Sequence, residues 1–363
     1  MDIHLVGGFL GSGKTTAIIA AAKRLGAAGR TVGVVTNDQG RYLVDSAFAR
    51  AEGVPAVEVT GGCFCCNYDD FARNVVALGR RVRPDVIFAE SVGTCTDLVA
   101  TVVKPLLATP QAEGRLRSLS VFSDIRLLDR WLDGRSLPFS ESVTYIFGKQ
   151  LEEAGAIVVN KADLLPGAQA RSIADRAALR VPGKEVLLQS SLRDEDVSRW
   201  LRLIDAGSGG GAATGLLPSA SLAIDYARYA AGEAELAWLD ARVSLHCRNG
   251  AREAVQAVLE GIASALRLRK AAVGHIKALV ESGGVSAKLS LTAADAELPR
   301  VPPLAGPRVA LGLNARAQIP AADLRQIVHE ALAGAAAERG FLYELEEEAA
   351  FHPGEPRPTH RMG

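Results

Sequence analysis

Three of the five cysteines of this chain lie within four positions, in the stretch TGGCFCCNYDD. Thiolates are favoured ligands of Zn²⁺ and of related metal ions, so Cys63, Cys65 and Cys66 predict a metal site. Cys65 and the adjacent Cys66 can bind one ion together only if the loop bends, so a change of loop conformation would alter the site. A permanent structural zinc site and a thiol redox sensor are the competing interpretations.

A second set of residues near the start predicts a phosphate-binding loop. The stretch GGFLGSGKTT follows a short apolar run and precedes a helical segment. Backbone N–H groups of such a loop wrap the phosphates, Lys14 reaches the β and γ oxygens, and the Thr15 hydroxyl ligates Mg²⁺. The expected nucleotide-binding residues of this loop are Gly8, Gly11, Ser12, Gly13, Lys14, Thr15 and Thr16.

The stretch VIFAESVG predicts a further part of a nucleotide-hydrolysing site. It is an apolar strand that ends in Glu90, and Gly93 follows three residues later. A carboxylate at this strand end would act on Mg²⁺ or on its water, and the Gly93 N–H would sense the γ-phosphate. We therefore predict Lys14, Thr15 and Glu90 as the catalytic residues, and Thr15 and Glu90 as Mg²⁺ ligands.

The stretch AIVVNKADLL indicates which base is bound. It places Asn160, Lys161 and Asp163 after a buried strand. An aspartate carboxylate accepts two hydrogen bonds from the N1–H and 2-amino group of guanine, whereas adenine offers no such pair, and the Lys161 stem would lie along the base. This favours GTP over ATP. Ser190 and Ser191, which end LLQSS, are expected to support the base through a loop N–H.

The order of the apolar runs predicts an α/β fold. Seven short β-branched runs alternate with helical stretches between residue 3 and about residue 200, which is typical of a parallel sheet covered by helices on both faces. Ligands of such sheets bind beyond the carboxyl ends of the strands. The predicted organisation is a P-loop GTPase domain (1–204), a flexible Gly- and Ser-rich linker (205–218) and a smaller α+β domain with an irregular tail (219–363), arranged as a split β-α-β sandwich.

Composition excludes several classes of partner. The 41 Lys and Arg residues balance the 41 Asp and Glu residues, so no basic surface for nucleic acid or for an anionic membrane is expected. No apolar run reaches the length of a membrane helix and no signal peptide is recognisable, so we expect a cytoplasmic protein. Thiols stay reduced in that compartment, which favours metal chemistry over disulfides.

The phosphate loop, the cysteine motif, the glutamate of ESVG and the NKAD motif, in this order, resemble the CobW-type GTPases, which are related to the urease and hydrogenase accessory GTPases. The resemblance covers roughly residues 1–200. It rests on Glu90, where signalling GTPases carry aspartate, and on the Cys-x-Cys-Cys motif after a glycine. It implies a GTP-dependent metallochaperone that delivers Zn²⁺ or Co²⁺ to a client enzyme or a cobalamin pathway. Asp38, at the acidic position of the family's Asn-Glu loop motif, and Cys95 are candidate additional ligands.

Several alternatives stay open. The second half does not match the usual CobW carboxyl-terminal domain, so a GTPase that loads or reactivates a corrinoid-dependent enzyme is a second hypothesis. A nucleotide-binding module with a structural zinc site is a third. In the loop after the second predicted strand, Asn37, Asp38 and Asp45 fit a ligand role and an ordinary polar loop equally well. The sequence leaves the metal, the client and the oligomeric state, monomer or homodimer, undetermined.

Overall fold

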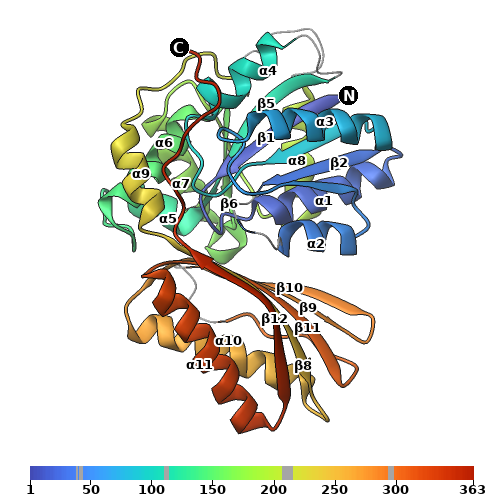
Figure 1. Cartoon of the computed structure of the whole chain (residues 1–363). Coiled ribbons are helices and arrows are strands. Elements are labelled where there is room, and N and C mark those ends of the chain that lie inside the picture. The colour runs from blue at the N-terminus through green and yellow to red at the C-terminus, as the bar shows by residue number, and fades with distance from the viewer. Residues whose placement is uncertain (38–39, 41–43, 110–113, 207–215, 293–297) are drawn as a thin grey trace. The chain divides into compact units, whose positions relative to one another are not determined.

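The computed structural model describes residues 1–37, 40, 44–109, 114–206, 216–292 and 298–363. The chain forms two compact units (Figure 1). The first unit comprises Met1–Gln39, Glu52–Tyr229 and Pro356–Gly363, and the second comprises Gly40–Ala51 and Ala230–Glu355. Within the described stretches, none of the helices combines the length and the apolar character needed to cross a bilayer.

The first unit is built on a seven-stranded sheet in the order β3-β2-β4-β1-β5-β6-β7. All its strand pairs are parallel. Its strands are β1 (Asp2–Gly8), β2 (Val32–Asn37), β3 (Ala56–Val59), β4 (Val86–Glu90), β5 (Arg115–Asp124), β6 (Ala156–Asn160) and β7 (Glu185–Leu188). Every residue of β2 and β4 is buried, which requires cover on both faces of the sheet. The predicted parallel α/β fold is therefore confirmed.

The helices of the first unit connect these strands. They are α1 (Lys14–Ala27), α3 (Tyr68–Val82), η1 (Val99–Val103), α4 (Lys104–Ala108), α5 (Ile125–Leu132), α6 (Glu141–Glu153), η2 (Ala162–Leu164), α7 (Gly167–Arg180), α8 (Asp194–Ala206) and α9 (Tyr226–Ala234), the last of which extends into the second unit. After β4 the chain crosses to β5 on the other side of β1. Ligands of open parallel sheets bind at such a change of direction, so the ends of β4 and β1 are the expected position for a site.

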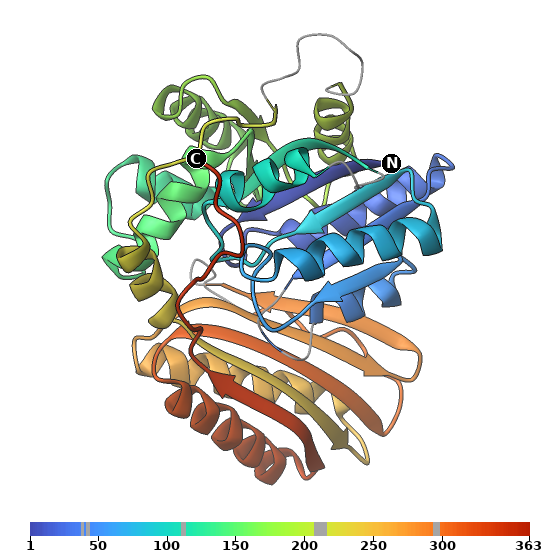
Figure 2. The same ribbon diagram turned by 45° about the horizontal axis from the view of Figure 1, so that its top comes forward.

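The second unit contains a five-stranded antiparallel sheet in the order β10-β9-β11-β8-β12. Its strands are β8 (Ala237–His246), β9 (Ala272–Ser282), β10 (Val285–Leu291), β11 (Arg308–Gln318) and β12 (Leu342–Phe351), and its long helices are α10 (Ala251–Leu268) and α11 (Ala321–Arg339). Figure 2 shows α10 and α11 together on one face of this sheet. Because β11 lies between β8 and β9, and β8 lies between β11 and β12, both helical connections are split β-α-β units, as predicted.

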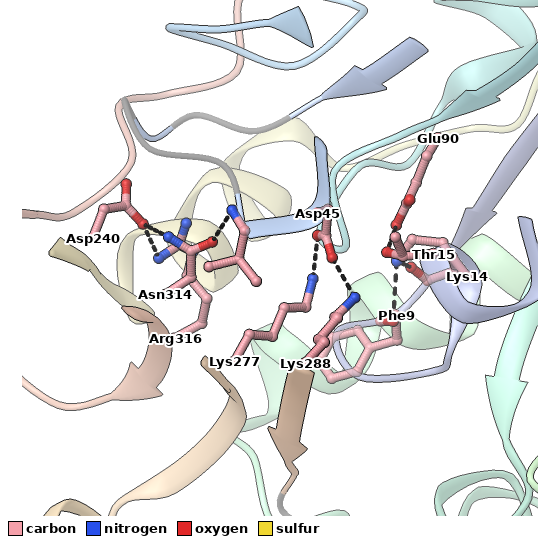
Figure 3. A network of polar contacts seen from close by, with 12 residues as sticks. Phe9, Lys14, Thr15, Asp45, Glu90, Asp240, Lys277, Lys288, Asn314 and Arg316 are labelled. Atoms are coloured by element: carbon pink, nitrogen blue, oxygen red, sulfur yellow. Dashed lines mark hydrogen bonds and ion pairs between the residues drawn. The ribbon is translucent and has the colours of Figure 1, made fainter. Parts of the chain in front are cut away.

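Helix α2 (Val44–Ala51) belongs to the second unit, although its sequence position lies between β2 and β3. The Asp45 carboxylate forms ion pairs with Lys277 at 2.5 Å and with Lys288 at 2.6 Å, and the Val44 N–H donates to Asn314 Oδ1 at 3.0 Å (Figure 3). The Asp45 carboxylate, for which the sequence allowed a ligand role, is thus paired with two lysines. The predicted boundary, which placed residues 1–204 in one domain, does not anticipate that Gly40–Ala51 belongs to the second unit.

Two other segments also differ from the predicted division. Residues 216–229 and 356–363 belong to the first unit, whereas the sequence assigned 219–363 to the second. The predicted linker, 205–218, lies largely outside the described residues. Residues 352–363 contain no helix or strand, in agreement with the predicted irregular tail.

Candidate functional site

The phosphate-binding loop joins β1 to α1 and depends on two glycines. Gly8 has a φ of 124°, and a Cβ at this position would lie 2.1 Å from the carbonyl oxygen of Phe122. Gly13 has a φ of 91°, and a Cβ there would lie 2.4 Å from Asn160 Nδ2. Only glycine tolerates both constraints. Gly13 directly precedes α1, and the first N–H groups of a helix favour a bound anion.

The three predicted catalytic side chains lie together at the carboxyl ends of β1 and β4 (Figure 3). The Lys14 ammonium donates to the carbonyl oxygens of Gly8 at 2.8 Å and of Phe9 at 3.4 Å. The Thr15 hydroxyl donates to Glu90 Oε1 at 2.9 Å. Lys14, Thr15 and Glu90 are 7%, 5% and 5% exposed, so this polar group is almost completely shielded from solvent.

Asn160 connects the phosphate loop with the serines that follow β7. Its Nδ2 donates to the Ser12 carbonyl at 2.8 Å, and its Oδ1 accepts from the N–H of Ser191 at 3.1 Å and from the Ser191 hydroxyl at 2.9 Å. The neighbouring Ser190 N–H donates to Asp196 Oδ2 at 2.8 Å. Three residues predicted for the nucleotide site therefore form one network, in which the Asn160 amide holds two loops together.

Lys161 and Asp163 follow β6 in different environments. Lys161 has a φ of 63° and forms an ion pair with Asp124 at 3.0 Å, whereas the Asp163 side chain is exposed. Burial would raise the pKa of Asp124, but hydrogen bonds and charges from Arg126 and Lys161 outweigh it and hold this pKa below its usual value. Asp124 was missed in the sequence, although it ends the predicted strand LSVFSD and is acidic.

The segment after β4, residues 91–98, lies against the phosphate loop, and we call it the switch loop. A Cβ on Gly93 would come 2.6 Å from Leu10 Cδ2 and 3.1 Å from Leu10 Cα, so a side chain at this position would have to displace Leu10 of the phosphate loop. Gln150 on α6 donates from Nε2 to the carbonyl oxygens of Gly93 at 3.1 Å and of Cys95 at 2.8 Å. Gln150 thus fixes the loop that carries both residues. Nothing in the sequence indicated this role.

The predicted cysteine cluster is present in the loop between β3 and α3. The sulfurs of Cys63, Cys65 and Cys66 all lie within 4.8 Å of one another. The Cys63 and Cys66 sulfurs are 3.3 Å apart, and those of Cys65 and Cys66 are 3.8 Å apart. Cys63 and Cys65 are each 1% exposed, whereas Cys66 is partly exposed. The bend that a shared metal ion requires is therefore formed, with Cys66 as the member nearest to solvent.

Cys95 of the switch loop contacts this cluster. Hydrogen bonds with Cys65, Cys66 and Cys95 hold the pKa of the Cys63 thiol well below its usual value. The pKa of Cys66 is raised to about 11, chiefly by its hydrogen bond with Cys63. The structure thus brings the candidate additional ligand Cys95 beside the three clustered cysteines. The other candidate, Asp38, lies outside the described residues.

Asn37, at the end of β2, fixes the cysteine loop from its other side. Its Nδ2 donates to the carbonyl oxygens of Val59 at 3.0 Å and Gly62 at 2.7 Å, and its Oδ1 accepts from the Phe64 N–H at 2.8 Å. Both polar atoms of the amide are engaged, so Asn37 positions the loop. On β2 the preceding residue, Thr36, is the register partner of Glu90 on β4.

Comparisons with known proteins identify relatives of this chain. Residues 2–188 match the family model described as CobW/HypB/UreG, nucleotide-binding domain. The chain is 30% identical over 214 residues to a zinc chaperone CobW of Sinorhizobium, a match that covers 51% of this chain and 58% of that protein. It is 32% identical over 163 residues to the zinc chaperone YeiR of Escherichia coli, with 44% and 46% covered. The chain therefore spans about half the length of the curated relatives it matches.

A similar solved structure is that of HypB from Helicobacter pylori in complex with nickel. It is 17% identical, with a TM-score of 0.44, over 61% of this chain and 92% of that one.

Proposed function

The chain belongs to the CobW/HypB/UreG family of nucleotide-binding domains, and from this premise we propose that it is a Mg²⁺-dependent GTPase. In this proposal, GTP binding and hydrolysis control the binding of Zn²⁺ or Co²⁺ by the cysteine cluster and its delivery to a client protein. Two relatives are named zinc chaperones, which favours zinc over cobalt as the cargo. We also propose that the protein acts in the cytoplasm.

The nucleotide would bind at the carboxyl ends of β1, β4 and β6. The phosphates would lie on the N–H groups of the phosphate loop and of α1, and the Lys14 ammonium would exchange its carbonyl partners for phosphate oxygens. The exposed Asp163 carboxylate is available to accept the N1–H and 2-amino hydrogens of guanine. Positioning and charge neutralisation are the main requirements of phosphoryl transfer, and Lys14 supplies part of both.

The side chains beside the phosphate loop fit a magnesium ion. Mg²⁺ prefers oxygen ligands, and the Thr15 hydroxyl and the Glu90 carboxylate are buried oxygen donors 2.9 Å apart. Bound there, Mg²⁺ would neutralise charge on the β- and γ-phosphates. The Thr15 hydroxyl oxygen and a Glu90 carboxylate oxygen would both turn to the ion, so the hydrogen bond between them would be lost. The end of β4, which carries the switch loop, would therefore change its contacts when the nucleotide binds.

The observation that carries the proposal is the position of Cys95. The switch loop begins directly after Glu90 and reaches the cysteine cluster at Cys95, whose thiol bonds with Cys63 and Cys65. One short segment therefore contacts both the predicted Mg²⁺ ligand and the predicted cargo site. The three sulfurs within 4.8 Å of one another are those of Cys63, Cys65 and Cys66, and a turn of the Cys95 thiol toward the ion would complete the four soft ligands that zinc prefers.

Zinc titration of the metal-free protein tests the cargo site. We expect one tightly bound zinc ion per chain, and loss of tight binding when Cys63, Cys65 and Cys66 are all replaced by serine. Nucleotide binding by this variant should be preserved, because none of the three cysteines is among the residues proposed to bind the nucleotide. If the triple variant kept tight zinc binding, the proposed cargo site would be wrong. If removing zinc unfolded the protein, the structural-zinc interpretation would replace it.

A further inference from the structure

Residues 356–363, which we call the strap, cross the first unit to which they belong and run beside the cysteine loop (Figures 1 and 2). The Thr359 N–H donates to the Cys65 carbonyl at 2.8 Å, and the Thr359 hydroxyl donates to the Cys66 carbonyl at 2.8 Å. The Arg357 N–H donates to the Cys66 sulfur at 3.2 Å. The strap thus binds the backbone of two predicted metal ligands and the sulfur of one of them.

Arg361 anchors the strap to the switch loop. Its Nε donates to Asp97 Oδ2 at 2.8 Å, and its guanidinium also donates to the Leu222 carbonyl at 3.0 Å. The Tyr226 hydroxyl donates to the same Asp97 oxygen at 2.7 Å. Asp97 is 1% exposed and has a φ of 64°, a conformation uncommon for a residue with a side chain. A buried carboxylate is stable only when such partners compensate its charge. Arg361 therefore stabilises the Asp97 carboxylate, and Asp97 in turn holds the strap against the switch loop.

Further contacts fix the strap on either side of this anchor. The Met362 N–H donates to the Ala100 carbonyl at 2.9 Å. The His360 ring packs edge-on against Tyr68, with ring centroids 5.0 Å apart. The strap therefore joins the cysteine loop and the adjoining start of α3 to the end of the switch loop and to η1, from which they are separated in the sequence by the rest of α3 and by β4.

We infer that the strap is a displaceable lid that controls access to the cysteine site. Cys63 and Cys65 are buried, and the partly exposed Cys66 is the member whose sulfur the strap contacts, so an incoming ion or reagent would reach the cluster past the strap. The strap has no helix or strand of its own, and none of its residues is buried. It is held by hydrogen bonds and by the ion pairs of Arg361 with Asp97 and of His360 with Asp69, and not by the apolar core, so it can open without unfolding the unit.

Because Asp97, the anchor of the lid, lies on the switch loop, this inference rests on the proposed function and extends it to the control of metal access. If that function holds, the lid sets how fast the cargo metal enters and leaves.

The test compares thiol accessibility in the metal-free protein. The rate of reaction with a disulfide reagent such as 5,5′-dithiobis(2-nitrobenzoic acid) is measured for the wild type, for Arg361→Ala and for Thr359→Pro. Thr359→Pro removes both hydrogen bonds from Thr359 to the cysteine loop and leaves the Asp97 anchor in place. Arg325→Ala, which removes an arginine paired with Glu348 in the second unit, is the matched control.

We expect each strap variant to react at least tenfold faster than the wild type, and the control to react at the wild-type rate. The increase should disappear when Cys66→Ser is added, because Cys66 is the thiol that the strap covers. The strap variants should also release bound zinc to a chelator at least tenfold faster, with an unchanged amount bound at saturation. Thiol reaction rates within twofold of the wild type in both variants would overturn the inference. This readout needs neither zinc nor GTP, so it separates failure of the lid from failure of the proposed function.

Discussion

The Cys95 thiol hydrogen-bonds with Cys63, although Cys95 follows β4 and Cys63 follows β3. At the start of the same switch loop, the Glu90 carboxylate accepts the Thr15 hydroxyl of the phosphate loop. The strands that carry these loops lie in the order β3-β2-β4-β1, so their carboxyl ends follow one another along one edge of the sheet. A change in the position of Glu90 therefore has a short physical path to the cysteine cluster.

Replacing Cys95 by alanine should weaken zinc binding by at least tenfold, about 1.4 kcal/mol. Zinc in proteins is usually held by four ligands, and the variant would leave three cysteines. Cys247→Ala is the control, because Cys247 is a buried cysteine in the core of the second unit. Competition with a zinc chelator measures both affinities. An unchanged affinity in the Cys95 variant would show that Cys95 is a neighbour of the site and not a ligand.

Replacing Lys14 by alanine should lower the rate of GTP hydrolysis by at least 100-fold, about 2.7 kcal/mol of transition-state stabilisation. The ammonium contacts loop carbonyls and not the apolar core, so the fold should persist. Lys23→Ala is the matched control on the same helix, where Lys23 pairs with Glu52 at the surface. Phosphate release under single-turnover conditions gives the rate, and circular dichroism checks the fold. Wild-type turnover by the Lys14 variant would place hydrolysis elsewhere.

Asp163→Asn should lower GTP affinity by at least tenfold, about 1.4 kcal/mol, and increase binding of xanthosine triphosphate. The carboxylate accepts two hydrogens from guanine, whereas the asparagine amide can donate one hydrogen to the 2-oxo group of xanthine. Asp175→Asn, an exposed aspartate on α7, serves as the control. Fluorescent-nucleotide competition measures the affinities. Equal binding of ATP and GTP by the wild-type protein would refute the guanine assignment.

Asp45→Asn should destabilise the second unit by about 3–5 kcal/mol at neutral pH, because it leaves two largely buried lysines without their carboxylate. Burial would raise the pKa of Asp45, but the charges and hydrogen bonds of Lys277 and Lys288 hold it well below its usual 3.8. The pairing therefore stabilises the fold above pH 3.8, and this stabilisation is lost as the pH falls below that value through the lower folded-state pKa.

Urea unfolding from pH 7 down to pH 3 measures this effect. The difference in stability between the wild type and Asp45→Asn should narrow at the acidic end. Asp175→Asn, which changes an exposed aspartate on α7, should change stability little at any pH. A constant difference across the range would mean that Asp45 contributes by packing and not by charge.

Local signals in the sequence predicted much of the fold. The seven parallel strands were recognisable because each is a short β-branched run that ends in polar or glycine-rich residues. The glycine spacing before Lys14 predicted the phosphate loop because positive φ at Gly8 and Gly13 requires glycine. Clustering of three cysteines within four positions predicted their proximity, since a bend in so short a loop is enough to bring their sulfurs together.

Contacts between distant segments could not be predicted in this way. Asp45 pairs with lysines more than 200 positions away, and the Arg357 N–H meets the Cys66 sulfur across 291 positions. Neither contact has a periodic pattern or a motif, and each depends on how complete strands and loops are packed. The contact of Cys95 with the cluster could not be predicted for the same reason. It depends on the order of the strands in the sheet, in which β2 lies between β3 and β4.

The affinity of the cysteine site for zinc in two nucleotide states tests the central claim most directly. Chelator competition is carried out with Mg²⁺ and a non-hydrolysable GTP analogue, and again with Mg²⁺ and GDP. Coupling free energies between sites are typically about 1–3 kcal/mol, so zinc should bind roughly 5- to 150-fold tighter in the GTP-analogue state. Zinc should in turn tighten the binding of the GTP analogue, relative to GDP, by the same factor. The same zinc affinity in both nucleotide states would contradict the proposal that GTP controls the metal.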